Sequence, residues 1–337
     1  MNGQEFYAQD ASPRASWRLA VLMGANSRTY KFALGQTLFE FGRLGRDAVP
    51  LGEFAVTYSL GMARHLAQGP QAPQTVELSE QDFLAVATQE GAATLAAGHP
   101  TERLLTAAVR SMPAMVMQKF HNLRGSGVVP HTFYELEGTG RQRVVRLTPE
   151  LMRLARSEQA ASLAAELGAR WSIVESSFAA GVGRSLVEDG VTHDLDTLKL
   201  TDKLRRRAVT GIVEATIGFQ HGRCQICGDV LVLEDAIAVD HVFPFALMKR
   251  YGSVGAWHGP NLDTLWNLAP AHAACNGVKS DRLPTPAEIA RLAARNETIM
   301  QSPHPLRRTL QLSLKSALRG RNVSSWREFL EAVQAAA

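Results

Sequence analysis

The chain has 337 residues, and its composition of 45% hydrophobic and 20% charged residues is that of a soluble globular protein with a large core. No apolar run is long enough to span a bilayer, and the first ten residues lack the basic-then-apolar pattern of a secretion signal. These features argue against a membrane protein and predict a cytoplasmic location, where three cysteines stay reduced. The net charge of +4 is compatible with nucleic-acid binding.

The first half of the chain is predicted to be mostly helical. Apolar residues at helical spacing mark a long helical stretch over residues 17–45. Ser79 is expected to cap a later helix. A further helix is predicted over residues 101–123, with a kink at Pro113, because proline removes a helical hydrogen bond.

A change of pattern follows this helical stretch. Residues 132–136 and 143–147 alternate apolar and polar side chains around Glu-Gly-Thr-Gly-Arg, which predicts a basic β-hairpin. Thr148 and Pro149 then open another helix as its cap and first residue. Two interpretations stay open, a winged-helix-like DNA reader or a small α/β domain with solvated arginines. The absence of a recognition-helix pattern slightly favours the second.

A basic segment leads into the last third of the chain. Residues 181–196 are rich in turn formers and are predicted to be a hinge. The basic residues after the hinge are expected on a helix, either as a solvated face or as a clamp on a DNA backbone, and we favour the clamp. The predicted DNA-binding residues are Lys203, Arg205, Arg206 and Arg207.

All three cysteines lie in one stretch of this last third. Cys224 and Cys227 form a C-x-x-C pair, and His272 and Cys275 form a second pair at the same spacing. Two such pairs supply the four ligands of a tetrahedral Zn²⁺ site, and a site filled by four protein ligands is structural. The alternative is three buried apolar cysteines and a histidine with a structural partner. The clustering favours zinc.

The residues between and after the two pairs carry a second pattern. An apolar run over residues 230–239 predicts a β-hairpin, and a loop leads from there to a short helix. The pattern resembles that of the HNH nuclease family, whose core is a ββα-metal fold. The matching positions are Asp240-His241, Asn267-Leu268, and Cys275, Asn276 and Lys279 in a C-N-x-x-K run. The resemblance covers roughly residues 205–285, and His272 stands where the zinc-binding members usually have cysteine.

The resemblance implies a role for each matching residue. Asp240 and Asn276 would hold a catalytic Mg²⁺ or Mn²⁺ through oxygen atoms. His241 would be the general base, and Asn267 would orient it. Lys279 would contact a phosphate, although an ordinary solvated helix lysine is an equal alternative.

The expected chain is α+β and mostly helical. It has a recognition or partner domain over residues 1–200, an HNH module over 201–290 and a helical extension over 291–337. Thr285-Pro286, near the end of the module, and Ser325, in the extension, are expected to open helices. The predicted function is hydrolysis of DNA in restriction or anti-phage defence, and the expected partners are DNA, a second copy of the chain or a protein of a defence system. The alternatives are a homing or mobile-element nuclease, a subunit that is silent until released, and a zinc-stabilised DNA-binding module without activity.

Overall fold

A computed structural model describes residues 8, 10–24, 28–123, 127–179, 214, 216–232, 234–250, 257, 259–317 and 325–337. The protein is α+β and mostly helical, as predicted. It contains two compact units, an N-terminal unit over Tyr7–Asp189 and a C-terminal unit that includes Gly190–Ala337. The predicted division at residue 200 lies outside the described residues, and residues 291–337 belong to the C-terminal unit.

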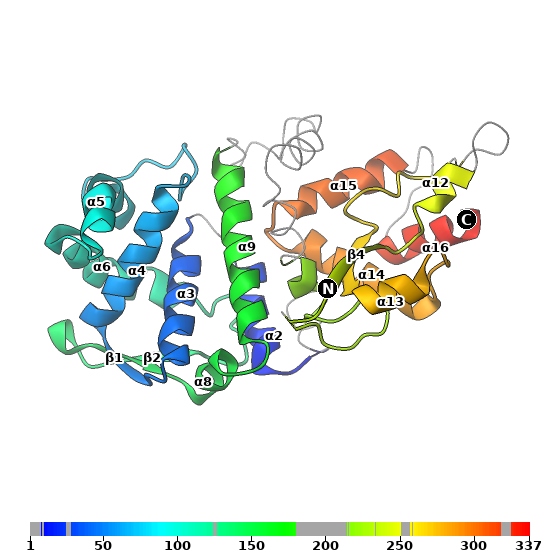
Figure 1. The fold of residues 1–337 in the computed structure, drawn as a ribbon. Coiled ribbons are helices and arrows are strands. Elements are labelled where there is room, and N and C mark those ends of the chain that lie inside the picture. Colours follow the sequence, from blue (N-terminus) through cyan, green and yellow to red (C-terminus); the bar gives the residue numbers. More distant parts are fainter. Residues whose placement is uncertain are drawn as a thin grey trace. The chain divides into compact units, whose positions relative to one another are not determined.

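The N-terminal unit is built around helix α3 (Tyr30–Arg43), which packs against α4 and α9 (Figure 1). Its phenylalanines and leucines are buried because they recur at helical spacing on the faces that contact those helices. The other helical elements of the unit are α2 (Pro13–Arg18), the π-helical turn η1 (Leu19–Met23), α4 (Leu51–Leu66), α5 (Phe83–Ala97), α6 (Glu102–Ala114), α7 (Val116–Lys119), the 3₁₀ turn η2 (Gly140–Gln142), α8 (Pro149–Ala155) and α9 (Ala160–Ala179).

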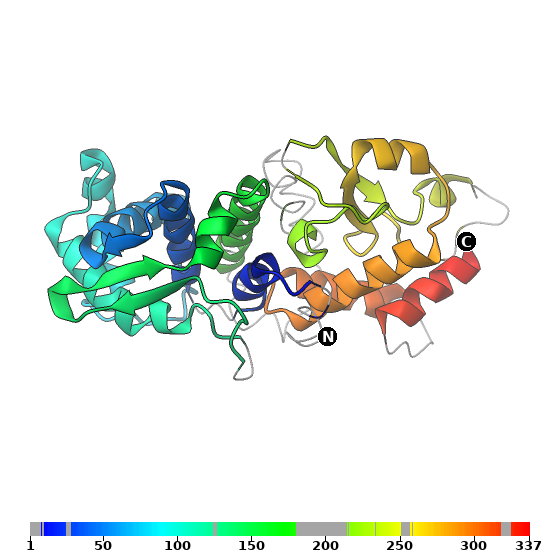
Figure 2. The same cartoon turned by 90° about the horizontal axis from the view of Figure 1, so that it is seen from below.

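A small antiparallel sheet lies at one end of α3 and α4, where Figure 2 shows its arrows. The predicted hairpin is confirmed as strands β2 (Tyr134–Glu137) and β3 (Val144–Leu147). A third strand that the sequence did not predict, β1 (Ala48–Pro50), pairs with the other edge of β3. It is three residues long and ends in a proline, so it is too short to show an alternating pattern.

Two helix boundaries differ in how well the sequence predicted them. The kink at Pro113 is confirmed, because α6 ends at Ala114 and α7 begins at Val116. The assignment of Ser79 as the cap of α5 is wrong. Asp82 is the cap, and its carboxylate accepts a hydrogen bond of 2.9 Å from the backbone N–H of Leu84.

The C-terminal unit contains a two-stranded antiparallel sheet and five described helices. The predicted hairpin over residues 230–239 is wrong, because β4 pairs with a strand that follows it by almost thirty residues. Thr285 and Ser325 cap helices as predicted. The elements are β4 (Ile237–His241), α12 (Ala246–Arg250), β5 (Leu268–His272), α13 (Ala273–Lys279), α14 (Pro286–Gln301), α15 (Leu306–Ala317) and α16 (Trp326–Ala336).

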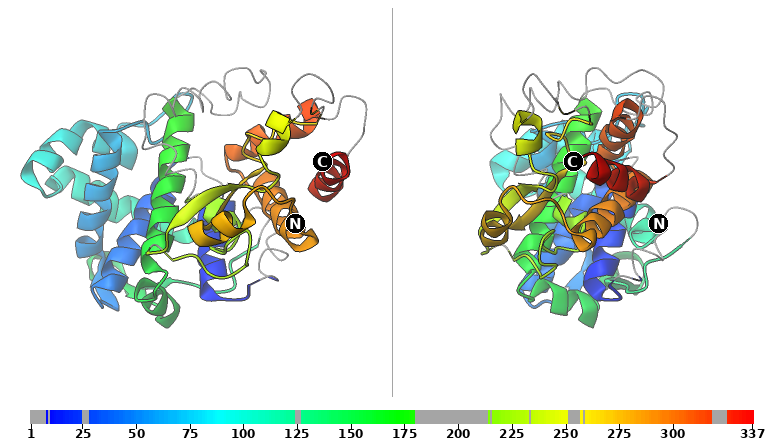
Figure 3. Two further views of the ribbon diagram at one scale, coloured as in Figure 1. Left: turned by 45° about the vertical axis from the view of Figure 1, so that its right-hand side comes forward. Right: turned by 90° about the vertical axis from the view of Figure 1, so that its right-hand side faces the viewer.

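Aromatic side chains from the segment before β5 and from α16 form a buried cluster in this unit. Trp266 precedes β5 and meets the ring of Phe329 edge-on, with ring centroids 5.0 Å apart. Trp326 completes the group from the start of α16, which packs against α14. Helix α13 lies against β4, as Figure 3 shows. Within the described residues, no helix is both long and apolar enough to cross a membrane.

Candidate functional site

The two predicted ligand pairs come together in the C-terminal unit. One ligand atom from each of Cys224, Cys227, His272 and Cys275 lies within 4.8 Å of all the others. The first pair precedes β4, and the second spans the junction between β5 and α13. The group is therefore able to hold a metal ion such as zinc, which would connect the two ends of the module.

Backbone N–H groups point at the sulfur atoms of this group. The N–H groups of Ile226 and His272 each lie 3.4 Å from the Sγ of Cys224, and that of Asp229 lies 3.4 Å from the Sγ of Cys227. Such contacts stabilise a negative thiolate. Burial and the neighbouring Cys224 sulfur nevertheless raise the pKa of Cys227 to about 12. Sulfurs this close together favour a cation between them.

His272 presents its two ring nitrogens to different partners. Its Nδ1 faces the sulfurs, 3.5 Å from that of Cys227 and 3.8 Å from that of Cys275. Its Nε2 lies 3.4 Å from a carboxylate oxygen of Asp235. A carboxylate behind a metal-binding histidine fixes the ring and makes it a stronger ligand. Asp235 is a residue of this site that the sequence did not reveal, because no motif position marks it.

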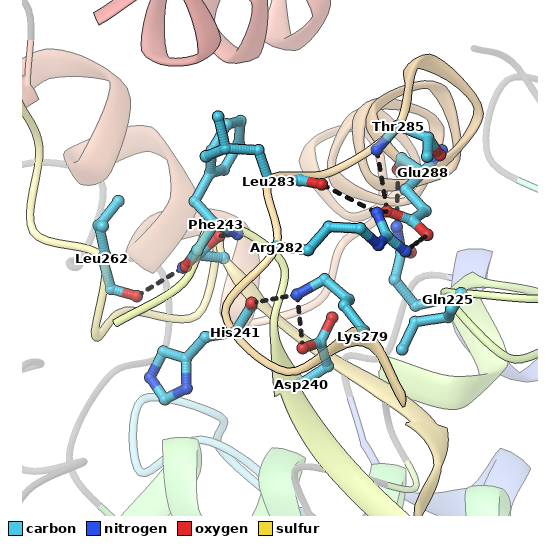
Figure 4. A network of polar contacts seen from close by, with 12 residues as sticks. Gln225, Asp240, His241, Phe243, Leu262, Lys279, Arg282, Leu283, Thr285 and Glu288 are labelled. Carbon is cyan, nitrogen blue, oxygen red and sulfur yellow. Dashed lines mark hydrogen bonds and ion pairs between the residues drawn. The ribbon is translucent and has the colours of Figure 1, made fainter. Parts of the chain in front are cut away.

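Helix α14 holds the first cysteine pair in place. Arg291 donates hydrogen bonds to the backbone carbonyls of Gln225 and Ile226, the two residues between the cysteines. The side chain of Gln225 in turn donates to the carbonyl of Glu288 at 2.6 Å. The carboxylate of Glu288 is bound by Arg282 and caps α14 (Figure 4). The metal group is thus supported by a helix that crosses the predicted module boundary at residue 290.

Asn267 is buried, and both the oxygen and the nitrogen of its side-chain amide form hydrogen bonds with the backbone. Its Oδ1 accepts from the N–H of Phe243 at 2.7 Å, and its Nδ2 donates to the carbonyls of Phe243 and Leu262, both at 2.8 Å. Phe243 lies two residues after His241, and Leu262 lies one residue before Asp263. Asn267 therefore fixes the spacing between those two backbone segments.

Asp240 and Lys279 form an ion pair in the interior. The Nζ of Lys279 lies 2.9 Å from the Oδ1 of Asp240 and 2.9 Å from the carbonyl oxygen of His241 (Figure 4). Asp240 is 2% exposed, and its Oδ2 has no hydrogen-bond partner among the described residues. Burial raises the pKa of Asp240, and the ammonium of Lys279 opposes that effect. The predicted contact of Lys279 with a phosphate stays a prediction.

The imidazole of His241 extends away from the carboxylate of Asp240 in Figure 4. Its Nε2 lies 3.0 Å from the Oδ1 of Asp263, and both side chains reach solvent. Asp263 lies in the loop before β5 and is not among the predicted site residues. The sequence feature that could have indicated Asp263 is a charged side chain four residues before Asn267.

The remaining predicted residues are less fully placed. Asn276 is half-buried on α13, one residue after Cys275 and one turn before Lys279. The predicted DNA-binding residues, Lys203, Arg205, Arg206 and Arg207, lie outside the described residues. A comparison of this chain with known protein families, curated proteins and solved structures finds no match.

Proposed function

We propose that this chain is a metal-dependent endonuclease of the HNH type that hydrolyses DNA phosphodiester bonds. The observation that supports the proposal most directly is the placement of Asn267. Its amide bonds both the segment after His241 and the segment before Asp263. That is the orienting role that the family resemblance implies for the central asparagine.

His241 is the proposed general base. When its Nε2–H is donated to Asp263, its Nδ1 is left with the lone pair that takes a proton from the attacking water. The ring is partly exposed, with a side-chain exposure of 31%, so water and a DNA phosphate are able to reach it. Asp263 would hold the ring in the tautomer that a base requires.

A magnesium or manganese ion would be held by Asp240 and Asn276 in this proposal. The fit rests on Asp240, because its Oδ2 is buried without a partner in the described part of the chain. A carboxylate and an amide oxygen suit a hard cation that keeps several waters. When bound, the ion would neutralise charge on the phosphate and on the leaving alkoxide.

A second candidate function is favoured by the Asp240–Lys279 pair. The ammonium of Lys279 already occupies one oxygen of the proposed metal ligand, and both side chains are almost fully buried. A subunit in this arrangement would stay silent until a partner or signal changed it. A constitutive nuclease would harm its own cell, so such control would fit a role in restriction or anti-phage defence.

Cleavage assays on three substrates test the proposal. Supercoiled plasmid, phage DNA and single-stranded DNA are incubated with the full-length protein in Mg²⁺ or Mn²⁺, beside His241→Ala. Exposed His99 provides the matched control His99→Ala. We expect cleavage by the wild type and by His99→Ala, and a loss of roughly 10²–10⁴-fold in His241→Ala, as for other general bases.

Zinc content is measured on the same samples, so that a folding defect is separated from a catalytic one. Equal cleavage by His241→Ala and wild type, with equal zinc, would refute the assignment of His241 as the base. No cleavage of any substrate by zinc-loaded wild type would favour the silent subunit. Cells that express an active nuclease, yet restrict neither phage nor incoming DNA, would argue against the defence role.

A further inference from the structure

Two basic side chains lie in the interior of the N-terminal unit. Arg170 of α9 is 0% exposed and Lys31 of α3 is 7% exposed. No carboxylate in the described ranges forms an ion pair with either side chain. An uncompensated charge in a protein interior is strongly unfavourable, so these two cations need an explanation.

The guanidinium of Arg170 has no described acceptor. Its Nε, Nη1 and Nη2 are all buried, and none of them has a hydrogen-bond partner among the described residues. Arginine cannot avoid the problem by losing its proton under physiological conditions, although burial lowers the pKa of Arg170 to about 9. The interior therefore offers several N–H donors at one place and lacks an acceptor for them.

Lys31 and Arg170 lie on facing helices. Helices α3 and α9 approach closely at Gly35, where an added Cβ would lie 3.1 Å from a methyl carbon of Leu167. Lys31 is one turn before Gly35, and Arg170 is one turn after Leu167. Burial and the nearby charge of Arg170 lower the pKa of Lys31 to about 8, which reflects two cations held near each other.

The ammonium of Lys31 is positioned by backbone. Its Nζ donates to the carbonyl of Ala20 at 3.0 Å, within the π-helical turn η1. A Cβ at Gly24 would lie 2.3 Å from that Nζ, so a side chain at position 24 would displace the ammonium. The same Nζ lies over the ring of Phe120, 5.6 Å from its centroid, and the protons not donated to Ala20 have no oxygen acceptor among the described residues.

The buried carboxylates of this unit already have partners. Both oxygens of Glu166 are bound by Arg18, at 2.8 and 2.6 Å. The Oε1 of Glu175 lies 2.6 Å from the Nδ1 of His65 and accepts from the Nε2 of Gln71 at 2.6 Å. An anion from outside the chain would therefore supply the acceptors that the donors of Arg170 and Lys31 lack among these carboxylates.

We propose that Lys31 and Arg170 form a binding site for a phosphate group, supplied as inorganic phosphate or as the terminal phosphate of a nucleotide. A guanidinium fork matches two oxygens of an oxyanion, and the ammonium adds a point charge beside it. A phosphate carries enough oxygen acceptors for the three nitrogens of Arg170 and for Lys31. Because both side chains are shut off from solvent, the bound group is a small one rather than the backbone of a DNA duplex. This site does not depend on the proposed nuclease function.

Equilibrium dialysis of the full-length protein tests the site, with labelled inorganic phosphate in one arm and labelled ATP in the other. The test variants are Arg170→Met and Lys31→Met, which keep side-chain length and remove the charge. The matched controls are Arg153→Met and Lys119→Met, which change exposed residues of α8 and α7. We expect one site per chain, weakened at least tenfold in each test variant and unchanged in both controls.

The two arms identify the source of the phosphate. Binding in the first arm assigns inorganic phosphate, and binding in the ATP arm alone assigns a nucleotide. The phosphorus content of the unfolded protein detects a group that stayed bound through purification. Absence of binding in both arms, with no such phosphorus, would overturn the proposal, as would unchanged affinity in Arg170→Met. If that variant does not fold, Arg170→Lys replaces it, and unchanged affinity there and in Lys31→Met would also overturn the proposal.

Discussion

The two units contain groups of side chains that suit ions of opposite charge. In the C-terminal unit, three cysteines and His272 converge on a place that suits a cation. In the N-terminal unit, Lys31 and Arg170 are buried on facing helices, and an anion would balance their charges. The cysteine site was visible in the sequence because its ligands come as two local pairs. The basic site was not, because its two members are distant in the chain and each resembles an ordinary helix residue.

Two arginines show that burial alone does not create the difference. Arg295 of α14 is also fully buried, and burial lowers its pKa to about 9, as it does for Arg170. Arg295 donates to the backbone carbonyls of Leu265 at 3.0 Å and Trp266 at 3.2 Å, and also to that of Leu268. Those carbonyls precede or open β5, and that of Trp266 also accepts from the Nδ2 of Asn296 at 3.0 Å. The donors of Arg295 thus bind backbone carbonyls of the fold, whereas those of Arg170 have no acceptor among the described residues.

Removing the metal ion from the cysteine–histidine group should have the largest effect on stability. The effect should be confined to the C-terminal unit. A zinc chelator is expected to unfold the C-terminal unit, because structural zinc contributes about 10–16 kcal/mol to such modules. The N-terminal unit should stay folded, since its core contains none of the four ligands. Calorimetry would then lose one transition and keep the other, and excess Zn²⁺ should restore the first. A thermogram unchanged by complete zinc removal would contradict the assignment of the site.

Replacing the two arginines by methionine should shift stability in opposite directions. Arg295→Met removes a donor from the carbonyls of Leu265, Trp266 and Leu268, of which that of Trp266 keeps the Nδ2 of Asn296, and is expected to cost about 1–3 kcal/mol. Arg170→Met removes a charge without described acceptors and, in the absence of phosphate, should be neutral or stabilising by about 1–4 kcal/mol. Urea unfolding of both variants in phosphate-free buffer measures the contrast. Equal destabilisation would mean that Arg170 has acceptors like those of Arg295.

The sequence predicted the group of three cysteines and His272 better than it predicted the strands around it. Spacing alone brought the four cysteine and histidine ligands together correctly, because local pairs at the ends of one module have few ways to arrange themselves. The hairpin over residues 230–239 failed because an apolar run does not reveal its partner strand. That partner is β5, reached after a long connection.

Residues that support the site from outside the motif were not predictable. Asp235 and Arg291 act through contacts with His272 and with backbone carbonyls, and neither contact leaves a periodic signal. The orientation of His241 away from Asp240, by contrast, follows from strand geometry, because the two are neighbours in β4 and successive side chains of a strand point to opposite faces. Motif spacing names the residues of a site but not the side chains that support it from outside.

The charge of Lys31 should be visible in the pH dependence of the N-terminal unit. Burial, together with the charge of Lys31, lowers the pKa of His121 from 6.5 to about 4. Below pH 6.5 the unfolded imidazole binds a proton that the folded one does not, so stability falls as pH falls towards 4. The loss is about 3 kcal/mol at most, from 1.36 kcal/mol per pH unit.

Urea unfolding between pH 4.5 and 7 checks this expectation. Lys31→Met should give a shallower decline than wild type, because it removes the nearby charge, and His121→Gln should remove most of the slope. His99→Ala changes an exposed histidine and should behave as wild type. Equal slopes in wild type and His121→Gln would show that His121 does not contribute.

The contact between Asp263 and His241 should have the smallest effect, because it is a charge contact at the surface. Asp263 has a side-chain exposure of 60%, so its loss should leave the stability of the C-terminal unit unchanged. If it holds the His241 ring, Asp263→Asn should lower kcat about tenfold with little change in KM, as when the outer partner of a working histidine is lost. Asp263→Glu should recover part of the rate. A change in KM alone would assign Asp263 to DNA binding instead, and equal rates in all three proteins would leave His241 oriented by the Asn267-bound backbone.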